Sequence, residues 1–118
     1  LRGLYLSDNN LQGRIPTDLC KFSSLEALFL DSNELFGPIP SCLGQLSKLQ
    51  QLYLFQNQFT GQIPTTFGGL QKLTGLGLEN NDFNGDMPDG VCKLVDQSSL
   101  DIWADCTDQS DSNSLLCD

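Results

Sequence analysis

Apolar residues return along this chain with a spacing that neither a helix nor a strand produces by itself. When the sequence is divided every 24 residues, positions 1, 4, 6, 11, 15, 19 and 22 are apolar in all four units. A period of two residues holds only between positions 4 and 6, and the pattern then jumps. Such spacing predicts a short strand, a turn and a return stretch that share one core. We therefore expect one solenoid coil in each of residues 1–24, 25–48, 49–72 and 73–96.

Three further positions explain how each coil turns. Every unit has glycine at position 13, where a side chain would obstruct a tight bend, and proline at position 16, which fixes φ after a short extended stretch. Position 9 is always asparagine, and an inward-pointing amide there would pair backbone groups that the turn leaves without partners. A buried polar group without a partner costs about 1–3 kcal/mol. We therefore assign a structural role to this column, which consists of Asn9, Asn33, Asn57 and Asn81.

The repeated string LxxLxLxxNxLxGxIPxxLxxLxx resembles the plant-type leucine-rich repeat of receptor-like kinases, receptor-like proteins and polygalacturonase-inhibiting proteins. It covers residues 1–96, and Met87 in place of isoleucine is the departure in its GxIP element. The resemblance implies an α/β solenoid, a right-handed superhelix with a parallel β-sheet on the concave face and short 3₁₀ or irregular segments on the convex face. It also implies binding through the concave face, usually outside the cell.

The repeat begins a fifth time and then changes, which predicts a C-terminal capping segment over residues 97–118. Leu100 and Ile102 fall on positions 4 and 6, so we expect one last strand there, followed by an acidic tail that contains cysteine. Asp105 falls on the asparagine column and is assigned the same structural role. The string LDIWADC resembles the last coil of leucine-rich receptor-like proteins from diatoms and related algae. At the other end, the first residue is already a repeat leucine, so an N-terminal cap is expected to be missing.

The five cysteines are typical of an oxidising compartment. We favour a disulfide between Cys106 and Cys117, with Cys92 as the competing partner of either. Cys20 and Cys42 lie in the return stretches of adjacent coils, where a disulfide and two buried thiols are equally open. Because the chain has no histidine and no CxxC pair, we expect no metal site and no cofactor.

The net charge of −9 falls entirely on the last third of the chain. Acidic and basic side chains balance over residues 1–78, whereas in residues 79–118 Lys93 alone opposes the acids. Such a chain is repelled by nucleic acid, so we expect no nucleic-acid partner. A solvated acidic end is favoured over a docking surface for a basic partner or a weak calcium site. No apolar run approaches the ~20 residues of a transmembrane segment.

Side chains at positions 3, 5, 7 and 8 are expected to point outward from the concave face. Strands about 4.8 Å apart would place the column-5 aromatic residues in a stripe, with Phe55 beside it. Aromatic residues also form sheets well without binding anything. Positions 4 and 6 already fill the core, however, so exposed rings among polar groups favour an interaction surface. Column 7 is expected to end at Trp103, beside Asp101 of column 5. The candidate ligand-binding residues are Tyr5, Phe29, Tyr53, Phe55, Asp31, Gln51, Gln56, Glu79 and Trp103.

Nothing in the sequence indicates catalysis. Without histidine, a Ser-His-Asp or Cys-His arrangement cannot form within the chain, and phosphate-binding glycine motifs are absent. The leading hypothesis is a recognition module for a protein, a peptide or possibly a glycan, located at the cell surface, outside the cell, or in a secretory or organellar lumen. Two alternatives stay open: a structural subunit of a larger complex, and the ligand-binding part of a receptor-like kinase.

Overall fold

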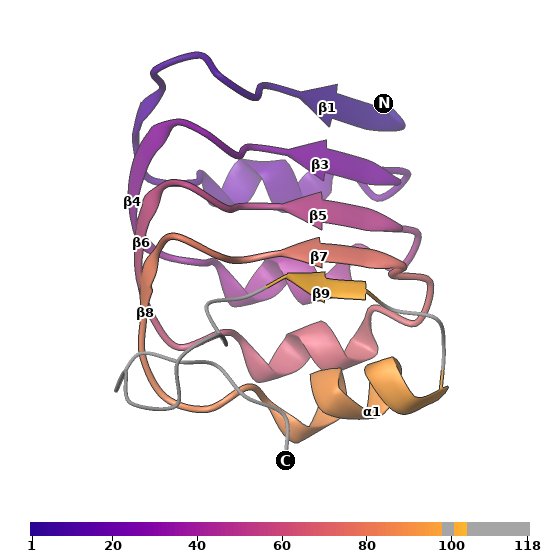
Figure 1. The fold of residues 1–118 in the computed structure, drawn as a ribbon. Coiled ribbons are helices and arrows are strands. Elements are labelled where there is room, and N and C mark those ends of the chain that lie inside the picture. Colours follow the sequence, from indigo (N-terminus) through magenta and orange to yellow (C-terminus); the bar gives the residue numbers. More distant parts are fainter. Residues whose placement is uncertain (98–100, 104–118) are drawn as a thin grey trace.

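The computed structural model describes residues 1–97 and 101–103, and the chain in these ranges winds into stacked coils (Figure 1). Each coil contributes one strand to a parallel sheet with the order β1-β3-β5-β7-β9. The register places position 4 of one coil opposite position 4 of the next, as in Leu28 opposite Leu52. The strands are β1 (Gly3–Tyr5), β3 (Ala27–Phe29), β5 (Gln51–Tyr53), β7 (Gly75–Gly77) and β9 (Asp101–Trp103).

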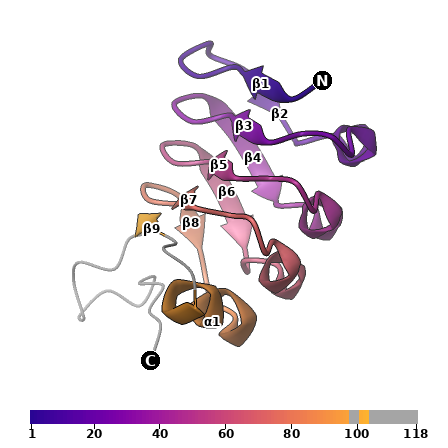
Figure 2. The ribbon, with the colours of Figure 1, turned by 90° about the vertical axis from the view of Figure 1, so that its right-hand side faces the viewer.

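A second parallel sheet, which we did not predict, follows the first one around each coil (Figure 2). In its longest strand, exposed and buried residues alternate from Glu34 to Pro38, so Leu35 points into the core. This alternation is the period of a half-buried strand, but it lasts too few residues to stand out in the sequence. The strands are β2 (Gln12–Gly13), β4 (Glu34–Pro38), β6 (Gln58–Gly61) and β8 (Asp82–Phe83).

Short helical segments form the convex side and complete the predicted solenoid architecture. Each of the first three begins after the repeat proline, which holds an extended conformation at its N-terminus. They are the 3₁₀ segments η1 (Thr17–Lys21), η2 (Ser41–Gln45) and η3 (Thr65–Gly69). The fourth coil instead has an α-helix of nine residues, α1 (Asp89–Gln97), which the repeat pattern did not predict.

The α-helix shifts the following strand by two residues from the register that the repeat spacing predicted. Trp103 pairs with Gly77, which is position 5 of the fourth coil. Asp101 pairs with Gly75 and therefore occupies position 3 instead of the predicted position 5. The prediction that column 7 ends at Trp103 was therefore wrong, and Ile102 occupies position 4 rather than position 6. The fourth coil has a nine-residue α-helix where the other coils have 3₁₀ segments of five residues, and an α-helix, which rises about 1.5 Å per residue against about 2.0 Å, uses more residues per unit length.

Several predictions concern residues outside the described ranges. They are the position of Leu100, the structural role of Asp105, the disulfide between Cys106 and Cys117, and the acidic tail up to residue 118.

The core runs through the centre of the stack. Leu28, Leu52 and Leu76 are fully buried one above another, and Phe59 fills the corner of the third coil. In the first coil the equivalent Leu4 is only partly buried, because no described coil covers its outer side. Burial therefore depends on having a neighbouring coil on each side.

The asparagine column forms a ladder of hydrogen bonds between coils. The Oδ1 atom of Asn57 accepts a bond from the Leu35 N–H at 3.0 Å. Its Nδ2 atom donates to the carbonyls of Leu30 at 2.9 Å and Leu54 at 3.2 Å. Asn33 and Asn81 form the equivalent bonds one coil before and one coil after.

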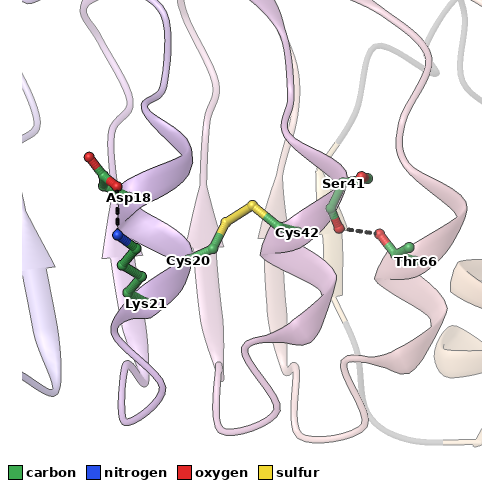
Figure 3. The surroundings of a disulfide bond; sticks show 6 residues. All are labelled: Asp18, Cys20, Lys21, Ser41, Cys42 and Thr66. Atoms are coloured by element: carbon green, nitrogen blue, oxygen red, sulfur yellow. Dashed lines mark hydrogen bonds and ion pairs between the residues drawn. A yellow bond between two sulfur atoms is a disulfide. The ribbon is translucent and has the colours of Figure 1, made fainter.

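A disulfide joins the first two coils on the convex side. Cys20 of η1 and Cys42 of η2 lie 5.9 Å apart between Cα atoms, so the alternative of two buried thiols does not hold (Figure 3). The next pair of coils is linked by a hydrogen bond of 2.6 Å from the Thr66 hydroxyl to the Ser41 carbonyl (Figure 3). Cys92 is also disulfide-bonded, and Cys20 and Cys42 already pair with each other, so the competing pairing that involves Cys92 is supported over the favoured one between Cys106 and Cys117.

We expect the double variant Cys20→Ser/Cys42→Ser to lower the free energy of unfolding by about 3 kcal/mol, because the bridge closes a loop between residues 22 apart in sequence. Urea denaturation followed by circular dichroism measures this loss. Thr66→Val is the matched control, since it removes the link between the next two coils but leaves the unfolded chain unconstrained as before. Its loss is expected to stay near 1 kcal/mol. Equal losses in the two variants would contradict the prediction.

Candidate functional site

Four aromatic side chains form a continuous row on the concave sheet. Tyr5, Phe29 and Tyr53 occupy the same register position of adjacent strands and point away from the core. The ring centroids of Tyr5 and Phe29 lie 4.9 Å apart in a T-shaped contact, and those of Phe29 and Tyr53 lie 4.6 Å apart. Phe55 extends the row, 6.1 Å from Tyr53. We call Tyr5, Phe29, Tyr53 and Phe55 the aromatic row.

Two glycines of β7 allow the end of this row to lie close to the sheet. A Cβ atom at Gly75 would come within 2.9 Å of the Tyr53 hydroxyl oxygen, and one at Gly77 within 2.8 Å of the Phe55 ring. The rings of Tyr53 and Phe55 therefore lean over the backbone of β7. The sequence analysis missed the role of these glycines, and the available signal was small residues at positions 3 and 5 of the fourth coil beside larger ones in the third.

Polar side chains run beside the aromatic row at positions 7 and 8. The Ser7 hydroxyl donates to the Asp31 carboxylate at 2.7 Å, and the Ser32 hydroxyl donates to Oε1 of Gln56 at 2.7 Å. Backbone bonds such as Gln56 N–H to the Glu79 carbonyl, 2.9 Å, continue the ladder past the strands and hold these positions in register. Position 8 has a positive φ in each coil. We call this border the polar edge, which consists of Ser7, Asp8, Asp31, Ser32, Gln56, Glu79 and Asn80.

Two further candidate residues, Gln51 and Gln56, lie on the same face. Gln51 is exposed in β5, one position before the buried Leu52, and Gln56 is exposed on the polar edge. Trp103, through its pairing with Gly77, shares the register position of Tyr53. Within residues 1–97 the structure thus brings the predicted binding residues onto one surface.

Two negative findings apply to the described ranges. Residues 1–97 and 101–103 contain no group of three acidic, cysteine or histidine side chains that could hold a metal ion. No helix within them has the length and apolar character needed to cross a membrane.

The architecture defines a class, the parallel-stranded solenoid with a concave sheet and a convex helical side. The chain matches the family described as Leucine Rich Repeat over residues 1–22, 24–46 and 48–70, and it belongs to that family. Its structural neighbours identify the repeat as the plant type. The resemblance of the C-terminal segment to algal proteins stays a prediction. A comparison with curated protein sequences finds no match.

Solved structures similar to this chain include a plant peptide hormone receptor and the ectodomain of a receptor kinase. One is the plant peptide hormone receptor RGFR1 in complex with RGF2, with a TM-score of 0.83 and 31% identity over 88% of this chain and 16% of that one. Another is PEPR1–AtPEP1, with a TM-score of 0.82 and 38% identity over 88% of this chain and 14% of that one. A third is the ectodomain of the receptor kinase SOBIR1 from Arabidopsis thaliana, with a TM-score of 0.79 and 32% identity over 88% of this chain and 54% of that one. The chain thus spans well under two thirds of each.

Proposed function

We propose that this chain is a non-catalytic recognition module that binds a peptide, or an extended segment of a protein, across its concave sheet. The observation that carries the proposal is the aromatic row, in which rings from three coils contact one another on the outer surface of the sheet. Tyr5 is 64% exposed and the rings beside it are partly exposed, so the row presents apolar area to solvent. Aromatic residues are enriched among the residues that dominate binding energy at interfaces.

The dimensions of the row suit an extended peptide. Strands lie about 4.8 Å apart and an extended peptide advances about 3.3 Å per residue, so two inter-strand steps correspond to roughly three ligand residues. Polar groups on the edge of the row supply donors and acceptors for the ligand backbone. The complexes of RGFR1 with RGF2 and of PEPR1 with AtPEP1 support peptide binding by the same architecture.

Two observations support a location outside the cell or in a secretory lumen. The Cys20–Cys42 disulfide is stable only where thiols are not kept reduced. The similar SOBIR1 structure is an ectodomain. A structural subunit of a larger complex is the competing function, and it would purify with its partners in fixed stoichiometry.

Selection of a displayed random-peptide library on the intact, oxidised chain tests this proposal. We expect enriched peptides whose affinity falls at least tenfold in the double variant Tyr5→Ala/Phe29→Ala, as measured by fluorescence anisotropy. The loss follows because both rings would be truncated within the row, and tenfold corresponds to about 1.4 kcal/mol.

Phe22→Ala/Phe36→Ala provides the matched control. These two rings are 44% and 43% exposed but lie outside the concave sheet, in the convex return and in β4. Affinity in this control should stay within twofold of the unmodified chain. The proposal is overturned if no peptide is enriched, or if the control pair reduces binding as much as the test pair.

A further inference from the structure

We infer that the segment bound on the concave face is basic, and that it places an arginine side chain over Phe55, between the carboxylates of Asp31 and Glu79. This inference rests on the proposed function and adds the chemistry of the ligand to it.

The first observation is the charge of the concave face. Positions 3, 5, 7 and 8 of the four coils include the acids Asp8, Asp31 and Glu79 but no lysine or arginine. Basic residues of the coils lie elsewhere: Arg14 stacks over a ring of the second sheet, 6.0 Å from its centroid, and Lys21 pairs with an acid of η1. The acids of this face therefore have no cationic partner on it, and a ligand with positive charge would complement them.

The second observation is that one carboxylate oxygen of Asp31 has only a long hydrogen-bond contact. Asp31 is only 7% exposed, and its Oδ1 accepts the Ser7 hydroxyl at 2.7 Å. Oδ2 lies 3.4 Å from the Ser32 hydroxyl, but the same hydroxyl lies only 2.7 Å from Oε1 of Gln56. A hydroxyl carries a single proton, and the shorter contact takes it. Oδ2 of Asp31 thus has only the long contact of 3.4 Å with a hydroxyl shared between two acceptors.

A carboxylate oxygen with no hydrogen-bond partner lies two coils further along the polar edge. Oε2 of Glu79 is buried and has no hydrogen-bond partner among the described residues. Buried polar atoms in native proteins are nearly always paired, so each exception needs an explanation. Here one ligand group could explain both, because Asp31 and Glu79 occupy the same position of the second and fourth coils.

Phe55 occupies that position in the coil between them, which defines the chemistry of the ligand group. A cation over an aromatic ring is attracted by its electron-rich face, and a donor beside a carboxylate forms a charge-assisted hydrogen bond. A guanidinium group does both, because it is flat, stacks on rings and offers five N–H donors. Arginine therefore fits this place better than lysine, whose ammonium group is a compact and strongly hydrated charge.

A divalent metal ion does not fit the same place. Calcium and magnesium require oxygen ligands within about 2.0–2.6 Å of the ion. Carboxylates two coils apart, with a phenyl ring between them, start from strands separated by about 9.6 Å, twice the spacing of neighbouring strands. The arrangement favours a flat organic cation.

The library selection described above tests this inference separately from the proposed function. We expect arginine to be enriched in peptides that bind through Tyr5 and Phe29. For the best such peptide, Asp31→Asn/Glu79→Gln should lower affinity at least tenfold at low salt and less as salt rises. The same peptide with citrulline in place of arginine should bind both proteins with equal, weaker affinity.

Asp18→Asn/Glu34→Gln is the control, because it makes the same change in net charge on the convex side and on the second sheet. The affinity of this control variant for the arginine peptide should stay within twofold of that of the unmodified chain. The near-isosteric test variant should melt near the temperature of the unmodified protein, since it keeps the shape of both side chains and removes a buried charge at Glu79 whose Oε2 has no partner. Peptides that need Tyr5 and Phe29 but lack arginine would overturn this inference and leave the proposed function standing. An equal loss for the arginine and citrulline peptides would also overturn it.

Discussion

Leu52→Ala is expected to lower the free energy of unfolding by about 4 kcal/mol, which would make it among the most damaging single changes in the described chain. Leu52 is fully buried in β5 and lies in register with Leu28 on one side and Leu76 on the other. Truncation would leave a cavity that two neighbouring coils border, and the close stacking of the strands limits its collapse. Urea denaturation followed by circular dichroism measures the change.

Leu4→Ala is the matched control for this experiment. Leu4 occupies the same position of the first coil, but it is only partly buried and has a described neighbour on one side alone. We expect its replacement to cost about 1–2 kcal/mol, in proportion to the smaller apolar area removed from water. Equal losses at Leu4 and Leu52 would show that the first coil is as well covered as the third, contrary to the described packing.

The coil architecture could be predicted from the sequence because each structural position recurs four times. A single leucine says little, but the same position in four units shows which side chains share the core. The asparagine column could be assigned for the same reason, since an amide that recurs among apolar positions needs partners inside. Repetition therefore supplied the information that a single pattern lacks.

The fourth coil shows where this reasoning ends. Val91 and Leu94 repeat the spacing of Leu43 and Leu46, and all four are buried. A spacing of three residues is compatible with both a 3₁₀ segment and an α-helix. The sequence alone therefore could not show that α1 would form where the second coil has η2. The error of two residues in the predicted register of β9 followed from that ambiguity.

The candidate site was predictable in outline but not in detail. The column of rings follows directly from the register of the strands. The tilt of Tyr53 and Phe55 over Gly75 and Gly77 depends on space, which the sequence reports only indirectly. The length of the contact between Asp31 and Ser32 reflects a second acceptor, Gln56, that lies closer to the same hydroxyl, and this distinction requires atomic positions.

Asn57→Ala is expected to lower the free energy of unfolding by about 3 kcal/mol, although the change removes no apolar group. Without the side chain, the buried Leu35 N–H loses its acceptor at 3.0 Å. The carbonyls of Leu30 and Leu54 lose a donor that links the second coil to the third. Each buried polar group left without a partner costs about 1–3 kcal/mol, and the carbonyls retain a second site for pairing, so the sum stays near the middle of the possible range.

Asn9→Ala separates this effect from the general cost of changing an asparagine. Asn9 has the same repeat position but is exposed, and its side chain forms a single bond of 3.0 Å to the Ser7 carbonyl. Its replacement should cost less than about 1 kcal/mol, because water can pair with the groups it leaves. If Asn9→Ala were as costly as Asn57→Ala in the same urea denaturation, the stabilisation would come from the turn within a coil. A large difference would instead show that the amide acts between coils, where each asparagine stabilises the stack only when a preceding coil supplies its carbonyl.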